Sequence, residues 1–480
     1  MTTSRVIPKV TVDLDIDGAL VDVYVRRALS VPAQLELTYA IAPHAPLPSV
    51  TAGPVEVRVE GHAASLFVGE VTATRVELGP GGQRRFVVRA YDRLHRLRRH
   101  RPVRLFTETD LFRLAEGLLS AAGCTLATSG RAPVRASIVQ HDVDDLTLLV
   151  HEAARVGRYL RADGREVELI DLDEHIVQAT LRAGDNLLEA SVETNVHEVF
   201  GEHVAWGASL DDASAHHASA RDTTLPEGTQ HHVDGLARAE GEVRAMAVAA
   251  RARSRLGARV LKAVVEGDPE LVPGDAVDVE GVGDDETFVM TAVVHRVDHH
   301  LGFVTEIDSS PPPTFELDRA TTLASGVVCD VEDPEARRRV RVRLTATADV
   351  QTPWLPVCLP GGGARKGFVT MPDEEDVVLI LAPRGDLANA VVLGGLYGRN
   401  EAPSSGTSGG KNHRYAWTTH AGQVVELDAD RGVVRVDDGR GTHLEMNEDE
   451  TLLHSSTDLR IAAPGRRMVL LADAIDFEQG

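Results

Sequence analysis

Apolar and polar residues alternate along much of this chain, and a period of two residues predicts β-strands. The alternation is clearest over Val10–Ile16, Leu35–Tyr39 and Phe67–Val76. Turn signals made of Gly, Pro and Asp lie between these segments. We therefore expect residues 1–105 to form an antiparallel β-barrel or sandwich.

Helical spacing replaces the alternation in residues 106–180, which predicts a small α/β insert. Thr109 or Asp110 is placed to cap the first helix, and Gly123 to end it. The second helix is expected over Asp144–Val156, before Gly157. Two strands should follow, over Tyr159–Ala162 and Glu166–Leu172, with a turn between them.

Residues 181–313 return to the β pattern and predict a second barrel that contains one helix. Ala, Val and Met recur on one face over Val233–Leu256, so we expect the helix there. Asp211–Gln230 is polar and rich in Ala, Ser and His, and we expect an exposed loop. The Pro-rich run Ser309–Pro313 marks a stiff boundary.

Residues 322–399 have the size and turn pattern of an oligonucleotide/oligosaccharide-binding (OB) barrel. The acidic turn Asp373–Asp376 precedes the apolar strand Val377–Leu381, and Val391–Leu393 follows it. A further strand is expected over Gly367–Met371. The fold alone does not determine a ligand.

A Gly/Ser-rich linker at residues 400–411 leads into residues 412–480, where short strands start at regular intervals near Val424, Val433 and His443. Each strand offers only two or three apolar side chains, so a single copy would leave them partly wet and expose strand edges. We therefore predict a homotrimeric β-prism; a sheet that packs back on the barrel is the alternative. The residues expected in the trimer core are Val425, Leu427, Val434, Val436, Leu444 and Leu453.

The fold class expected from this pattern is mainly β with a small α/β insert: two barrels, an OB barrel and a C-terminal trimeric β-prism. Aromatic residues make up only 4% of the chain, so Val, Leu, Ala and Ile must build the cores. The formal charge of −23 argues against a nucleic-acid partner or an anionic membrane. The basic run Arg93–Arg104 is interpreted as a solvated connector or a subunit contact.

Three scattered cysteines, without a CxxC pair, indicate neither a structural zinc site nor a disulfide framework. The start of the chain lacks the pattern of a secretory signal, and no run of eighteen apolar residues predicts a membrane span. We expect synthesis in the cytoplasm and no stable membrane insertion.

No G-x-S-x-G, H-E-x-x-H or P-loop motif is present. The adjacent pairs His216-His217, His231-His232 and His299-His300 should point to opposite faces of their strands, as hydrated surface groups. We therefore predict no catalytic residue, cofactor or metal site, and a protein that is not an enzyme. The alternative is an enzyme or carbohydrate-binding β protein acting on cell-wall polysaccharide, which the wide spacing of Trp206, Trp354 and Trp417 disfavours.

Several stretches carry a resemblance to a known family. They are Asp333-Pro334 with Arg339–Val342, then Trp354, then Met371–Val378, and finally Val391–Tyr397. These stretches, and the order of the predicted units, resemble the VgrG family of spike proteins from type VI secretion and related contractile injection systems. That family is similar to the fused hub and spike proteins of contractile phage tails.

The resemblance implies a homotrimeric hub and spike at the tip of a contractile injection apparatus, which pierces the target envelope. Its implied partners are the hexameric inner-tube ring, baseplate proteins and a PAAR-type tip protein; an effector cargo is left open. Ile475 and Phe477 would contact the tip protein. The implied location is the contractile particle itself, which is either phage-like or of the kind released outside the cell.

Overall fold

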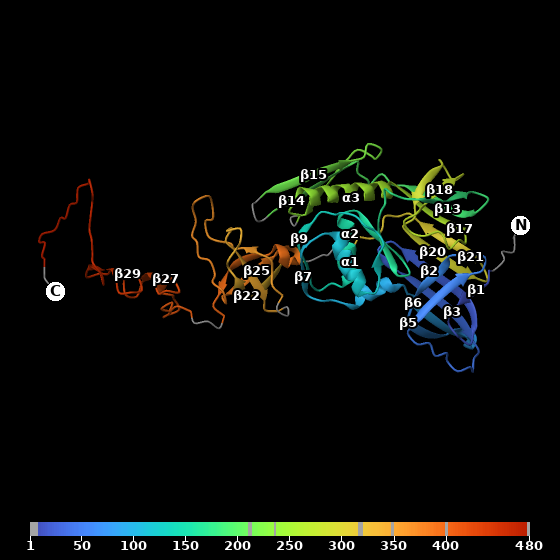
Figure 1. The fold of residues 1–480 in the computed structure, drawn as a ribbon, viewed down its shortest axis with the longest axis horizontal. Helices are drawn as coiled ribbons and strands as arrows, with labels where there is room; N and C mark the ends of the chain where they lie inside the picture. The colour runs from blue at the N-terminus through green and yellow to red at the C-terminus, as the bar shows by residue number, and fades with distance from the viewer. Residues whose placement is uncertain are drawn as a thin grey trace. The chain divides into compact units, whose positions relative to one another are not determined.

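The chain divides into two compact units, residues 1–396 and 397–480. The computed structural model describes residues 8–209, 214–234, 237–314, 320–346, 350–398 and 402–477. Residues 211–213 of the predicted loop and residues 400–401 of the predicted linker lie outside these ranges. Each unit is mainly β, and the helices belong to the first unit (Figure 1).

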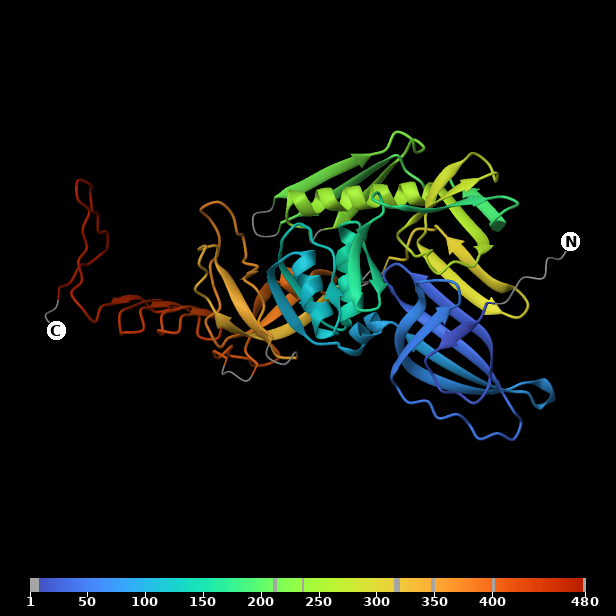
Figure 2. The same ribbon diagram turned by 45° about the vertical axis from the view of Figure 1, so that its right-hand side comes forward.

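One sheet of ten strands runs through the first unit. Its N-terminal strands are the blue strands at the lower right of Figure 2. The sheet joins both predicted barrels, because β2 pairs with β20, where Val25 lies opposite His295. From edge to edge the strands are β1 (Val10–Val12), β4 (Pro54–Val59), β5 (Ser65–Leu78), β6 (Arg84–Tyr91), β3 (Val31–Ile41), β2 (Ala19–Ala28), β20 (Ala292–Asp298), β21 (Gly302–Asp308), β17 (Arg259–Glu266) and β13 (Leu187–Thr194).

Two separate hydrophobic cores form along this sheet. The predicted alternation places Leu35 and Phe67 in the first core, around β2 to β6. Leu261, Met290 and Ile307 belong to the second core, around β13, β17 and β21. The two predicted barrels are therefore two cores on one continuous sheet.

The α/β insert follows the predicted caps. Asp110 Oδ1 accepts hydrogen bonds from the backbone N–H groups of Phe112 and Arg113 at 2.8 and 3.1 Å, and Asp144 Oδ1 accepts one from Thr147 at 2.9 Å. These contacts satisfy N–H groups that a helix start leaves free. The elements are the 3-10 helix η2 (Arg93–Arg99), β7 (Arg104–Thr109), α1 (Leu111–Ala121), β8 (Thr125–Leu126), β9 (Arg135–Gln140), α2 (Asp145–Arg155), β10 (Arg158–Asp163) and β11 (Glu166–Asp171).

Two three-stranded sheets complete the hub part of the first unit. Helix α3 (Glu240–Ala258) packs closely against β14, where a Cβ on Gly207 would lie only 2.8 Å from Cγ2 of Val243. The sheets are β12 (Val177–Arg182), β18 (Ala276–Glu280), β19 (Glu286–Val289), and β15 (Ala215–Arg221), β14 (Glu202–Ala208), β16 (Thr229–Asp234), each in spatial order.

Two expectations for this region were wrong. Asp211–Gln230 was expected as a loop, but β15 and the start of β16 lie within it. Val233 was expected to begin a helix, yet it pairs with Trp206 in the ladder of β14 and β16, and α3 begins at Glu240. The strands of this sheet use Ala and His where most strands use large apolar residues, so the alternation is weak.

The OB barrel packs on the insert. Its core includes Val139 of β9, and Nε2 of His141 lies 2.9 Å from the carbonyl oxygen of Gly385. The strands in order are β24 (Leu355–Pro356), β23 (Arg339–Leu344), β22 (Thr322–Asp330), β25 (Val377–Ala382) and β26 (Val391–Leu396). The expected strand over Gly367–Met371 is absent from the described residues, because the preceding Gly-rich turn has left-handed backbone at Gly361 and leads into exposed chain.

The second unit is an antiparallel meander. Its strands are β27 (Arg414–Thr418), β28 (Val424–Asp428), β29 (Val433–Asp437), β30 (His443–Met446) and β31 (Thr451–His454). The predicted starts at Val424, Val433 and His443 are confirmed. The described residues that follow β31 belong to no strand.

A two-pronged ion pair fixes one turn of the OB barrel. Arg339 donates from Nη2 to Oδ1 of Asp333 at 2.8 Å and from Nε to Oδ2 at 3.1 Å. Both side chains are nearly buried, and the hydrogen bonds from Arg339 hold the pKa of Asp333 well below its usual range. The charged form of Asp333 therefore stabilises the fold above the ordinary Asp pKa, and this stability is lost as the pH falls.

We expect Asp333→Asn to lower the free energy of unfolding at pH 7 by about 2 kcal/mol, because Arg339 loses a charged, hydrogen-bonded partner. Chemical denaturation of the full chain measures the change. The matched control is Glu335→Gln, since Glu335 is half exposed and also contacts Arg339; it should cost less than about 0.5 kcal/mol. Equal effects of the two variants would contradict the prediction.

Candidate interaction surfaces

The register of β27 to β31 sorts their side chains onto two faces. Val425 lies opposite Trp417 on one side and Val436 on the other. Val436 in turn lies opposite Leu444, which faces Leu453. Residues paired across a ladder share a face. The apolar face therefore consists of Tyr415, Trp417, Val425, Leu427, Val434, Val436, Leu444, Met446 and Leu453.

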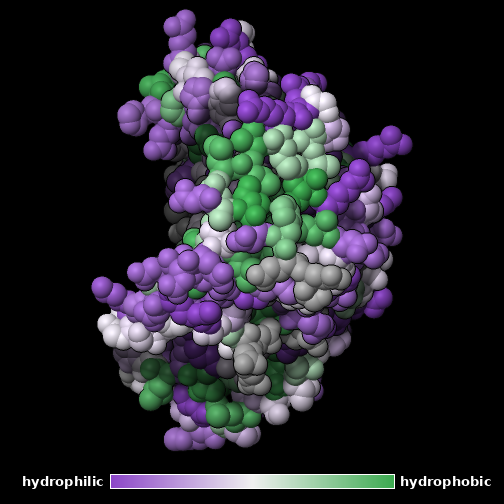
Figure 3. Space-filling model, turned by 90° about the vertical axis from the view of Figure 1, so that its left-hand side faces the viewer, coloured by the Kyte–Doolittle hydropathy of each residue, from purple (hydrophilic) through white to green (hydrophobic). Residues whose placement is uncertain are grey.

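The apolar face is open in a single chain. The exposed fraction is 63% for Tyr415, 58% for Trp417, 48% for Leu427, 45% for Val436 and 50% for Leu453. Figure 3 draws one side of the molecule and shows a gathering of apolar side chains there, but it labels no residue of the apolar face. Soluble monomers rarely leave a large apolar area uncovered, so such a surface indicates an interaction site.

The opposite side of the same sheet, here the charged face, is crossed by ion pairs. Arg414 Nη2 lies 3.0 Å from Oδ2 of Asp428. Arg435 joins Glu445 on the next strand at 2.9 Å and Asp437 on its own strand at 2.6 Å. The hydrogen bonds from Arg435 lower the pKa of Asp437. This face is suited to water, and its charges are satisfied within one chain.

All six residues predicted for a trimer core lie on the apolar face. Tyr415, Trp417 and Met446 share it and were missed, although the two-residue spacing of Tyr415 and Trp417 was a usable signal. The predicted tip contacts Ile475 and Phe477 are exposed, Phe477 by 92%.

Two of the three adjacent histidine pairs alternate between the two sides of a strand as expected, but the expectation of opposite faces was wrong for His299 and His300, which lie in an exposed turn with ring centroids 4.1 Å apart. The expectation of hydrated surface groups was wrong for His232, which contacts His203. His217 and His231 are exposed, whereas His216 and His232 are half-buried. Within the described ranges, no group of three or more His, Cys, Asp and Glu side chains is arranged to hold a metal ion. In the same ranges no helix has the length and apolar character needed to cross a membrane.

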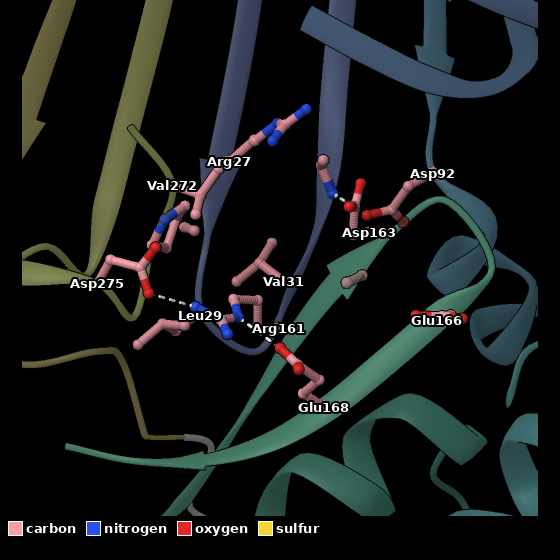
Figure 4. A pocket seen from close by; sticks show the side chains of 14 residues that line it. Arg27, Leu29, Val31, Asp92, Arg161, Asp163, Glu166, Glu168, Val272 and Asp275 are labelled. Atoms are coloured by element: carbon pink, nitrogen blue, oxygen red, sulfur yellow. Dashed lines mark hydrogen bonds and ion pairs between the residues drawn. The ribbon is translucent and has the colours of Figure 1, made fainter. Parts of the chain in front are cut away.

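A cavity of about 280 Å³ lies where the turn between β2 and β3, the β10–β11 hairpin and residues 272–275 meet (Figure 4). Arg161 points into it between two carboxylates, with Glu168 and Asp275 both at 2.7 Å. Arg27 also lines it and donates to the carbonyl oxygen of Leu66 at 2.8 Å. Both cations of this mixed-charge cavity are therefore occupied by groups of the same chain.

Two buried titratable groups near this cavity have opposite shifts. Burial raises the pKa of Asp92 to about 7, while its carboxylate accepts hydrogen bonds from the backbone of Ala33 and Leu94. Burial also lowers the pKa of His295 to about 3, and Nδ1 of His295 lies 3.0 Å from the hydroxyl of Thr305. Each group holds local structure together and needs no catalytic explanation.

Comparison with known families identifies the OB barrel. Residues 324–397 match the family model of the type VI secretion system/phage-baseplate injector OB domain. The match covers the ion pair of Asp333 and Arg339 and all five strands of this sheet except the first residues of β22. No match was found among curated proteins.

Solved structures extend the likeness over most of the chain. A chain of the lidded Francisella PdpA–VgrG complex aligns with a TM-score of 0.58 at 8% identity, covering 91% of this chain and 76% of that one. The chain has a VgrG-like fold. E. coli c3393, a type VI secretion component with structural similarity to the T4 tail proteins gp27 and gp5, aligns with a TM-score of 0.54 at 16% identity, covering 81% of this chain and 99% of its own.

A tail protein from Neisseria meningitidis MC58 aligns with a TM-score of 0.50 at 16% identity, covering 63% of this chain and 95% of its own. The predicted resemblance and the mainly β fold with an OB domain are confirmed. At these identities the likeness concerns the fold of this VgrG-like chain.

The buried His295 gives a pH dependence with a defined sign. His295 stays neutral in the folded chain, whereas an unfolded histidine takes up a proton below about pH 6.5. Its contribution to stability is therefore lost as the pH falls from 6.5. Asn at position 295 keeps a polar group near Thr305 but does not titrate. We therefore expect the free energy of unfolding to fall by about 2 kcal/mol less in His295→Asn than in the wild type between pH 6.5 and 5.0. Denaturation curves at both pH values measure it, and equal slopes for the two proteins would contradict it.

Proposed function

We propose that this chain forms the homotrimeric hub and spike of a contractile injection apparatus. The apolar face of β27 to β31 is the observation that carries the proposal, because nothing within the described part of the second unit covers it. Two further copies would bury this face on every chain, at about 25 cal/mol for each Å² of apolar area. A closed three-sided prism would also protect the edge strands β27 and β31 from pairing with other chains.

The hub part supports attachment to a tube of six-fold symmetry. Each chain carries two β cores on one ten-stranded sheet. Three chains would present six β modules, which would reconcile a three-fold spike with a hexameric ring. The VgrG-like fold favours the inner tube and baseplate proteins as partners on this side.

The end of the chain supports a tip partner. Residues beyond β31 include exposed Leu459, Ile461, Leu470, Ile475 and Phe477. A PAAR-type protein seated on the three chain ends would cover such side chains. Contraction of the surrounding sheath would then drive tip and prism through an envelope, and this role needs mechanical stiffness and no catalytic group.

An enzyme that binds polysaccharide is less well supported. Such a protein needs paired acids beside stacking aromatic rings in one groove. Trp206 stacks on His217 at 5.0 Å in the hub, Trp354 lies beneath the guanidinium of Arg341 at 5.0 Å in the OB barrel, and Trp417 lies on β27. The three rings belong to three different sheets.

Neighbouring leucines on β31 provide a matched test of the trimer. Leu453 lies on the apolar face, whereas Leu452 pairs with Glu445 on the charged face, and both are exposed. We expect Leu453→Lys to abolish the trimer, because three ammonium groups would be forced into the core, and Leu452→Lys to leave it intact. Light scattering coupled to size-exclusion chromatography measures the mass of each protein.

A wild-type chain that is monomeric at micromolar concentration would overturn the trimer. So would a Leu453→Lys protein that assembles as well as Leu452→Lys. Val436→Lys, on the central strand of the same face, provides an independent repeat and should behave like Leu453→Lys.

Replacement of Ile475 and Phe477 by Ser should weaken binding of a PAAR-type protein by at least tenfold and leave the trimer unchanged, since both side chains follow the meander. Biolayer interferometry with the immobilised trimer measures the affinity. The control is Leu459→Ser, which lies nearer to β31. Unchanged affinity in the double variant would contradict the predicted tip contact.

A further inference from the structure

Two histidines from neighbouring strands face one another inside the hub. His203 of β14 is only 1% exposed, and its Nδ1 lies 3.0 Å from Nε2 of His232 on β16. The rings stack with centroids 5.3 Å apart and planes 23° apart, and the ring of Phe200 meets His203 edge-on. In the parallel ladder His232 lies opposite Ala205, so the two rings are diagonal neighbours on the same face of the sheet.

A hydrogen bond between two imidazole nitrogens contains one proton. One ring donates N–H and the other accepts through a lone pair, so at least one ring must be neutral. If both rings were protonated, two N–H groups would face one another at 3.0 Å. Nε2 of His203 is buried and makes no hydrogen bond in the described structure.

The surroundings also disfavour charge on this pair. Burial and then the charge of His232 lower the pKa of His203, although the backbone of Phe200 acts in the opposite direction. Burial and then the charge of His231 lower the pKa of His232. Both rings line a cavity of about 800 Å³. The other titratable groups that line this cavity are His151 and Arg155 of α2, Tyr159 of β10, Arg253 of α3 and Glu198 before β14.

Among these groups Glu198 is the single carboxylate, and it is exposed. The nearby carboxylate of Asp234 is engaged in an ion pair with Arg155. Arg253 donates to the carbonyl oxygen of Pro312. The described lining of the cavity that adjoins His203 and His232 therefore has more cations than anions, and Glu198 is its single carboxylate.

Strand β16 is an edge strand. It lies at the edge of the sheet β15-β14-β16 and pairs with β14 alone. Its side chains contact β14 where Thr229 meets Glu202, His231 meets Trp206 and His232 meets His203, and Asp234 pairs with Arg155 of α2. A change at the histidine pair therefore acts on the middle of an edge strand.

We propose that His203 and His232 form an acid-sensitive latch. At neutral pH their hydrogen bond fastens β16 to β14, and proton uptake from solvent in mild acid breaks it, frees the edge strand and opens the adjoining cavity. The latch resides within one chain, so it does not depend on the proposed trimer or on its partners.

Hydrogen-exchange mass spectrometry of the full chain at pH 7.5 and 5.0, corrected for the intrinsic exchange rate, tests the latch. We expect protection of residues 229–234 to fall by about tenfold or more at pH 5.0, because each bound proton favours the open form by up to tenfold per pH unit below the ordinary histidine pKa. Strand β25 of the OB barrel contains no histidine and is the internal control.

His232→Gln separates charge from hydrogen bonding, since Gln can donate to Nδ1 of His203 but does not titrate. Its β16 should lose less protection at pH 5.0 than the wild type. His299→Gln, in an exposed turn, should keep the full response. Exchange of the imidazole C2 hydrogens in the wild-type chain gives the titration midpoint of each histidine without any substitution.

We expect midpoints for His203 and His232 below the ordinary histidine pKa of about 6.5. The latch is overturned if their midpoints equal or exceed that value, or if β16 keeps its protection at pH 5.0. A folded His232→Gln protein with the full wild-type response would overturn it as well.

Discussion

The C-terminal sheet has two faces and only one layer, and the proposed trimer follows from this constraint. In the hub, helices and facing strands cover the sheets, so Leu35 and Val243 are fully buried. In the meander of β27 to β31 the corresponding side chains remain in water. Hydrophobic stabilisation requires a covering layer, and a strip of five short strands cannot fold back on itself to supply one. A symmetric assembly of identical chains is the simplest source of that layer, because the apolar face of each chain is then covered by the same face of the other chains.

The charged face determines which side of the C-terminal sheet stays in contact with water. Burying Arg414 and Asp428 together with Arg435 and Glu445 would remove paired charges from water, and the attraction within the pairs seldom compensates for that loss. The apolar face carries no such cost. Alternate residues of each strand are therefore suited to water and to a buried core. This alternation also fixes the register of the strands, since a slip by one residue would exchange the two faces. The ion pairs contribute more to the choice of orientation than to the stability of the exposed surface.

The sequence contains the information for elements with strong local signals. Asp110 and Asp144, which cap the two helices of the insert, predict where these helices begin. The regular spacing of the turns predicts the meander. The sequence is much less informative about contacts between segments that lie far apart in the chain. The strand β15 has Ala and His on both of its sides, with His216 and Ala218 half-buried and Ala215 and His217 exposed, so its alternation carries little contrast. The extent of the ten-stranded sheet depends on pairing between β2 and β20, which lie far apart in the chain. The six predicted apolar positions share a face because period two is a local property. The contact of His203 with His232 requires the register of a parallel ladder, which local periodicity does not supply.

Stiffness is distributed unevenly along this chain, and that bears on the proposed piercing role. The hub and the OB barrel are joined by packing: Val139 of the insert belongs to the OB core, His141 reaches Gly385, and Arg238 donates to Asn389. The OB barrel and the meander are joined by a Gly/Ser-rich segment, and such segments transmit little bending force. In a spike under load, alignment of the meander must therefore come from contacts between chains. The exposed apolar face would then serve two purposes, since the burial that completes each sheet would also stiffen the connection through the Gly/Ser-rich segment.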